Sequence, residues 1–252
     1  MFIALLTALA LSGATSAPPA TASTAGTSGA TAPLREVVYK VTFTRRLEVQ
    51  NETYGGNVMN NETVSAAAPA FAQANSDASD KGTITIDIMQ VAGDALGMRV
   101  TERWDGSTPS GTYVGNVASD GSVNFTDGQM NECTRAILEY FGPGVMAGQP
   151  ANTGVAWERM ATGQSADVDT KYSVGAIEGA IANIHEQSTV KSKSVALTDT
   201  VVTTDVQYKP AMLAPVSGRI VMHASRSSAS SVTNISTIGN FDRVSDSRDK
   251  GP

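Results

Sequence analysis

Residues 36 to 49 read EVVYKVTFTRRLEV, and this stretch decides the fold class. Apolar side chains occupy alternate positions along it, namely Val37, Tyr39, Val41, Phe43, Leu47 and Val49. This period of two is typical of a strand with one buried face. Since a strand of this length would extend about 50 Å, we expect it to bend, bulge or break near Arg45 and Arg46. A sheet built on it should curve strongly.

Similar alternation recurs along the rest of the chain. The segments that show it are 83–88, 96–103, 113–118, 122–125, 155–157, 169–177, 180–190, 194–208, 219–226 and 231–244. Turn signals separate several of them, such as Gly93-Asp94, Asp120-Gly121 and Glu178-Gly179. Residues 51–80 lack a clear period and are interpreted as a long loop. The sequence therefore predicts a mostly β single domain of about ten mainly antiparallel strands, forming a strongly curved sheet or a partly open barrel.

One helix is predicted in mid-chain, at about residues 127–141. Thr126 and Gln129 have the spacing of a capping box, and Gly142-Pro143 ends the pattern. The helical period places Cys133 on the apolar face, where a thiol is usually an inert small hydrophobe. The helix divides the strands into two groups of similar size.

The N-terminal residues differ in composition from this domain. Residues 1–17 contain an apolar run followed by small residues, which is typical of a secretory signal peptide cleaved after Ala17, and no transmembrane segment is expected in the mature chain. Residues 18–34 are dominated by Ala, Thr, Ser, Gly and Pro and are interpreted as a flexible tether. The domain is predicted over 35–244, with a frayed polar tail at 245–252. We therefore expect an exported protein, periplasmic or extracellular.

The charged and metal-binding residues exclude several function classes. The net charge is −6 and the sequence pI is about 4.9, which argues against nucleic acid as a partner. With 1 Cys and 2 His among 252 residues, neither a disulfide framework nor a cysteine-rich zinc site can form, and no metal or cofactor is predicted. His185 and His223 both fall in predicted strands, where a hydrogen-bonded side chain is a commoner role than a general base.

Close pairs of acidic residues offer the other route to chemistry. Asp77 with Asp80, and Asp167 with Asp169, are most simply explained as solvated turns. A catalytic carboxylate pair meets in space and not along the chain, so the sequence leaves a glycosidase open.

Three function classes follow from these features. The preferred hypothesis is an exported, non-enzymatic binding module that holds an apolar small molecule or an envelope component on a curved sheet. Candidate ligand-binding residues are Trp104, Trp157, Tyr140 and Phe141, although ordinary core packing would explain them as well. The alternatives are an exported hydrolase that uses convergent carboxylates or a histidine, and a structural or adhesive surface domain. The sequence makes no prediction of oligomeric state.

Overall fold

The computed structural model describes most of the predicted domain. The described residues are 32–51, 74–119, 121–125, 130–142, 144–146, 149–162, 166–193, 200–227 and 231–250. The predicted signal peptide and all but the last residues of the predicted tether lie outside them.

Eleven strands form one antiparallel sheet in the described chain, so the predicted β-rich, single-sheet class is confirmed. The strands are β1 (Arg35–Asn51), β2 (Ala74–Ala92), β3 (Ala95–Trp104), β4 (Gly111–Val117), β5 (Val123–Phe125), β6 (Ala156–Thr162), β7 (Ala166–Glu178), β8 (Ile181–Ser192), β9 (Thr200–Lys209), β10 (Ala214–Ser227) and β11 (Ser231–Asp246).

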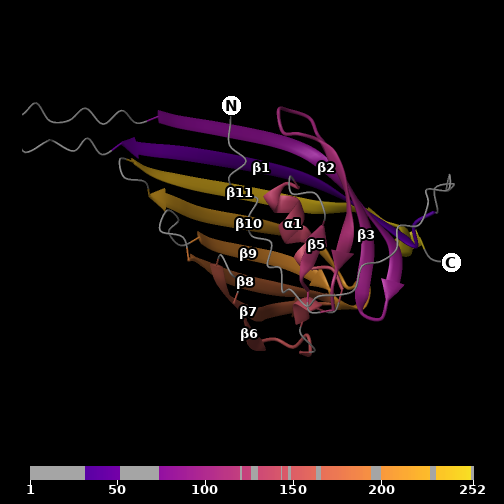
Figure 1. Cartoon of the computed structure of the whole chain (residues 1–252). Coiled ribbons are helices and arrows are strands. Elements are labelled where there is room, and N and C mark those ends of the chain that lie inside the picture. The colour runs from indigo at the N-terminus through magenta and orange to yellow at the C-terminus, as the bar shows by residue number, and fades with distance from the viewer. Residues whose placement is uncertain are drawn as a thin grey trace, which may run out of the picture.

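The order across the sheet is β5-β4-β3-β2-β1-β11-β10-β9-β8-β7-β6. The first and last strands are therefore central neighbours, while β5 and β6, which flank the helical segment, are the two edges and leave the sheet open. Figure 1 shows the sheet curving, with the single described α-helix, α1 (Glu132–Glu139), against one face and the strands continuing well past it. We call the face that carries α1 the inner face. None of the described helices is both long enough and apolar enough to cross a membrane.

The helix starts later than predicted. Met130 and Asn131 are not helical, and the Asn131 side chain caps α1 by accepting a hydrogen bond of 2.9 Å from the Cys133 amide. Asn is among the most favoured N-cap residues. The predicted capping box, Thr126 to Gln129, lies outside the described ranges. The expected end of the helix is close to the observed one.

Several strands differ in extent from the predicted segments, and three of the differences, in β1, β2 and β11, affect the centre of the sheet. β1 runs through Arg45 and Arg46 without a break, and its register shift against β11 lies between Val38 and Tyr39 instead. The predicted loop over 51–80 is wrong at its C-terminal end, because β2 begins at Ala74 and residues 74–80 pair with β1 although they lack apolar alternation. Residues 52–73 of that loop lie outside the described ranges.

The C-terminal residues carry the third difference. β11 reaches Asp246 and is followed by the 3-10 helix η3 (Ser247–Lys250). Asp246 accepts hydrogen bonds from Arg35 at 3.0 and 2.5 Å, in a buried ion pair that fastens the end of β11 to the start of β1. The described domain therefore extends past residue 244.

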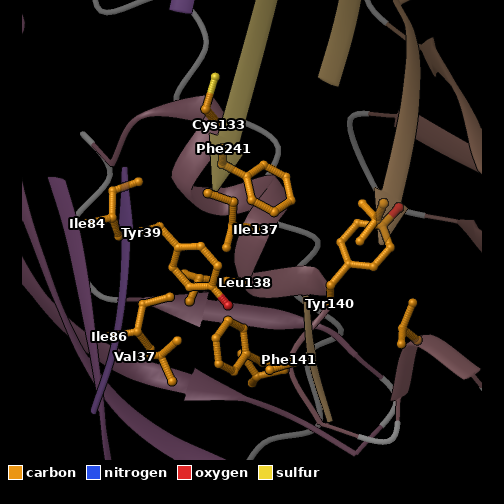
Figure 2. Packing of buried hydrophobic residues seen from close by; sticks show 14 of the residues in the cluster. Val37, Tyr39, Ile84, Ile86, Cys133, Ile137, Leu138, Tyr140, Phe141 and Phe241 are labelled. Carbon is orange, nitrogen blue, oxygen red and sulfur yellow. The ribbon is translucent and has the colours of Figure 1, made fainter. Parts of the chain in front are cut away.

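The core lies between α1 and the inner face (Figure 2). Tyr39 makes edge-to-face contacts with Phe141 and Phe241, with ring centroids 6.2 and 5.9 Å apart. Cys133 packs so closely on β11 that a Cβ at Gly239 would lie 2.4 Å from its sulfur, which is why that position requires glycine. Cys133 is buried, as predicted, and burial raises the pKa of its thiol to about 12, so it stays protonated and unreactive.

Candidate functional site

The inner face is organised in rows of residues that are direct partners in register across the sheet. One row lies nearest to α1 and crosses seven strands, from β1 to β6. It is buried on every strand except β6, and its members are Phe43, Gly239, Ile220, Thr204, Glu186, Tyr172 and Trp157. We call it the buried row. The next row outward along the strands, the mixed row, contains Arg45, Thr237, Met222, Val202, Ser188, Thr170 and Arg159.

The third row outward is almost entirely apolar and is half-buried on every strand. It contains Leu47, Ile235, Ala224, Thr200, Val190, Val168 and Ala161. Seven adjacent strands spaced about 4.8 Å apart give this apolar row a length of about 29 Å. Such a run of partly exposed apolar side chains on the inner side of a curved sheet is the surface best suited to an extended apolar ligand.

Three of the predicted ligand residues belong to the core. Tyr140 and Phe141 are buried next to α1, and Trp104 is buried against Phe43, with ring centroids 5.3 Å apart. Because these side chains already fill space between helix and sheet, they offer a ligand little free surface in this conformation. Their role as ligand contacts stays a prediction.

Trp157 differs from the other three. It is half-buried on the edge strand β6 and stacks on Tyr172, with ring centroids 5.1 Å apart. Its indole N–H is buried without a hydrogen-bond partner. Trp157 is therefore the predicted ligand residue that still has both a partly open surface and an unused donor.

Two buried carboxyl clusters lie on the inner face, and neither was predicted. Glu102 on β3 accepts hydrogen bonds from the Asn131 amide at 3.0 Å, from Trp104 Nε1 at 3.3 Å and from the Tyr113 hydroxyl at 3.4 Å. Burial raises the pKa of Glu102. Because it holds the residue that caps α1, Glu102 fixes where the helix starts.

The second cluster joins the other end of α1 to β8. Glu186 accepts hydrogen bonds from the Tyr140 hydroxyl and, at 2.8 Å, from the Ser188 hydroxyl. The hydroxyl oxygens of Ser188 and Thr170 are in turn 2.9 Å apart. Burial raises the pKa of Glu186. Burial and the charge of Glu186 together raise the pKa of Glu139 to about 8.

These two acids can hold a proton at neutral pH. Burial and the repulsion between two negative charges oppose the ionisation of Glu139 and Glu186 at the same time. The charges of Arg135 and Arg159 act in the opposite direction and lower the pKa of Glu139. The pair is thus able to give or accept a proton where an ordinary surface glutamate would stay ionised.

Neither histidine belongs to these clusters. His185 lies on the opposite, outer face, where its Nδ1 is 2.7 Å from Asp205 Oδ1 in a cross-strand pair whose side chains are 52% and 67% exposed. His223 is also on the outer face, in a shallow groove with Arg46 and Ser236. Both are exposed strand side chains on the outer face, and neither is hydrogen-bonded to an inner-face cluster in the described ranges.

The paired aspartates have structural contacts. Asp80 accepts backbone hydrogen bonds from Gly106 at 2.8 Å and Thr108 at 3.0 Å and so orders the β3–β4 connection. Asp167 pairs with Lys193 at 2.8 Å. Within the described ranges, no three His, Cys, Asp or Glu side chains gather in a way that could hold a metal ion.

A signal for the missed acids is present in the sequence. Glu186 continues the alternation of Ala182 and Ile184 on β8, and Glu102 continues that of Met98 and Val100 on β3. A carboxylate at a strand position that should hold an apolar side chain is expected to be buried. Acids that are buried in this way are candidates for a functional or a structural role.

Comparison with known proteins supplies no family for this chain. No protein-family model matches it, and no curated protein matches its sequence.

Proposed function

We propose that this chain is an exported, non-enzymatic binding protein that holds an apolar ligand on the inner face of its sheet. The observation that carries the proposal is the apolar row, from Leu47 on β1 to Ala161 on the edge strand β6, with its side chains half-buried. Burying the rest of this surface against a ligand would contribute about 25 cal/mol for each Å² of apolar area removed from water.

The mixed row gives the ligand a polar boundary on the helix side. Arg45 and Arg159 stand at its two ends, and the hydroxyls of Ser188 and Thr170 lie between them. An amphipathic molecule could therefore place its chain on the apolar row and its polar group toward α1. Trp157, the one predicted ligand residue with a free donor, adjoins the β6 end of this boundary.

The first experiment is to identify what the protein carries. The full chain is purified from its own host, extracted with organic solvent and analysed by mass spectrometry, and binding of an apolar dye is measured on the extracted protein. We expect a co-purifying apolar molecule and saturable dye binding. A clean extract together with no dye binding would contradict the proposal and favour a structural or adhesive role.

A matched pair of variants locates the ligand on one face. Val190 belongs to the apolar row, whereas Val221 is half-buried on the outer face. Val190→Asp should weaken dye binding at least about tenfold, because a carboxylate would be desolvated under the ligand, and Val221→Asp should not. Equal loss in both variants at equal thermal stability would exclude the apolar row as the site.

Export is tested by the N-terminus of the protein recovered outside the cytoplasm. We expect that sequence to begin at Pro18, after cleavage behind Ala17. Recovery of the chain only from the cytoplasm, with residues 1–17 retained, would overturn this part of the proposal.

A hydrolase is the second candidate, favoured by the Glu139 and Glu186 pair. One acid could protonate a leaving oxygen while the other carboxylate accepts a proton from an attacking water, as in acetal and glycoside hydrolysis. The test is turnover of aryl glycosides. An activity that Glu186→Gln abolishes and the exposed-site control Glu178→Gln retains would establish catalysis, and the absence of turnover on a broad glycoside panel would remove this candidate.

A further inference from the structure

Two buried hydrogen-bonding groups lie side by side on the inner face without partners. Arg45 Nε and Thr237 Oγ1 are both buried and unpaired, and the two residues face each other across β1 and β11. One terminal nitrogen of the Arg45 guanidinium donates to Glu132 Oε2 at 2.6 Å. Folded proteins rarely leave such groups unpaired in their interior, so an absent acceptor is the simplest explanation.

The place of these groups links them to the apolar row. Leu47 follows Arg45 by two residues on β1, and Ile235 precedes Thr237 by two on β11, so both apolar side chains lie next to the unpaired groups on the same face. The Arg45 side chain is 37% exposed. A molecule that lies on Leu47 and Ile235 would therefore be next to both unpaired groups.

The local charge selects the kind of acceptor. Arg45 is already neutralised by Glu132, and Thr237 is only 2% exposed. A second carboxylate here would be desolvated beside Glu132 without a free positive charge to pair with. An uncharged oxygen can accept both hydrogen bonds without that penalty.

We propose that the Arg45 Nε–H and the Thr237 hydroxyl bind the carbonyl oxygen of an uncharged acyl ester or amide, whose hydrocarbon chain lies along the apolar row. This inference rests on the proposed function and adds the chemical class of the ligand. It assigns Thr237 and Arg45 as specificity residues, and it leaves the hydrocarbon contact to Leu47, Ile235 and the rest of the row.

The test compares three probes of one chain length, delivered from cyclodextrin at pH 7: dodecane, methyl dodecanoate and dodecanoate. Each displaces an apolar dye from the wild-type chain, Thr237→Val, Thr237→Ser, Arg45→Lys and the outer-face control Thr203→Val. We expect wild type to bind the methyl ester about tenfold more tightly than dodecane and more tightly than dodecanoate, as a net hydrogen-bond gain requires. Thr237→Val and Arg45→Lys should lose this preference while retaining dodecane affinity, and Thr237→Ser and Thr203→Val should keep it.

The outcomes separate the two proposals. Equal affinity for ester and hydrocarbon, tighter binding of dodecanoate, or an ester preference unchanged in Thr237→Val would overturn the inference but leave the binding function standing. Failure of every probe to displace the dye, or of the dye to bind, would overturn both.

Discussion

The two ends of the inner face differ in how far they are covered. At the helix end, the buried row lies next to α1, and its residues from Phe43 to Tyr172 are buried. The apolar row begins four residues further along β1, at Leu47, and is half-buried on seven strands. The strands and the alternation are the same in both places. What differs is the covering element, because α1 has only eight residues and covers one end of strands that are up to nineteen residues long. The length mismatch between helix and strands therefore creates the candidate binding face.

The largest expected difference between the two ends is in stability. Phe141→Ala should reduce the free energy of unfolding by about 3–5 kcal/mol, because it removes a fully buried ring from the core. Leu47→Ala should reduce it by less than about 2 kcal/mol, because Leu47 already contacts solvent. Urea denaturation measures both, and equal losses would mean that the apolar row is as tightly packed as the core.

The pH dependence of stability should also come from the helix end. Glu139 and Glu186 have raised pKa values in the folded protein, so the folded state binds protons that the unfolded state has released. Stability is then greatest below the ordinary glutamate pKa and falls as the pH rises toward about 8, the folded pKa of Glu139. We expect a fall of at least about 1.4 kcal/mol between pH 5 and pH 8.5, the equivalent of one pKa unit.

Substitution identifies the groups responsible for that fall. Glu186→Gln should flatten it, since it removes one acid and the charge that raises the pKa of the other. Glu178→Gln, an exposed carboxyl on β7, is the control and should leave the slope unchanged. A slope that persists in Glu186→Gln would show that other groups set it. Asp246 acts in the opposite direction. Burial acts to raise its pKa, but the hydrogen bonds from Arg35 and Arg248 and the charges of Arg35 and Arg243 together lower it, so its stabilisation is lost as the pH falls through the acid range.

A smaller effect is expected at the cap of α1. Asn131→Ala should cost about 1 kcal/mol, because it leaves the Cys133 amide without its acceptor. Asn240→Ala, on the exposed outer side of β11, should cost less than about 0.5 kcal/mol. Equal stability of the two variants in thermal unfolding would contradict the assignment of Asn131 as the cap.

The smallest expected signal is spectroscopic. An apolar ligand should alter the fluorescence of half-buried Trp157 and leave that of buried Trp104 nearly unchanged. Trp104→Phe should therefore keep the ligand response, and Trp157→Phe should lose it. The reverse pattern would place the ligand within the core and not on the open end.

Period-two alternation was enough to predict the strands, the sheet and its curvature, because burial on one face leaves a direct mark on the sequence. It failed for residues 74–80, which pair with β1 through their backbone and carry no apolar pattern. The helix start was misplaced because a capping box is a local signal, whereas Asn131 is held as the cap by Glu102 from a distant strand. The rows of the inner face depend on the register between strands, which spacing along the chain does not give. For this reason the sequence did not predict that Arg45 lies beside Thr237, or that Tyr140 is hydrogen-bonded to Glu186.

The most direct measurement is photocrosslinking with an acyl chain that carries a diazirine, followed by peptide mapping. The binding proposal predicts labels on inner-face positions of the apolar row, above all Val168 and Val190 on the neighbouring strands β7 and β8, and their loss when an excess of unlabelled ligand competes. Labels on outer-face positions such as Val221, or labels that competition does not reduce, would contradict it.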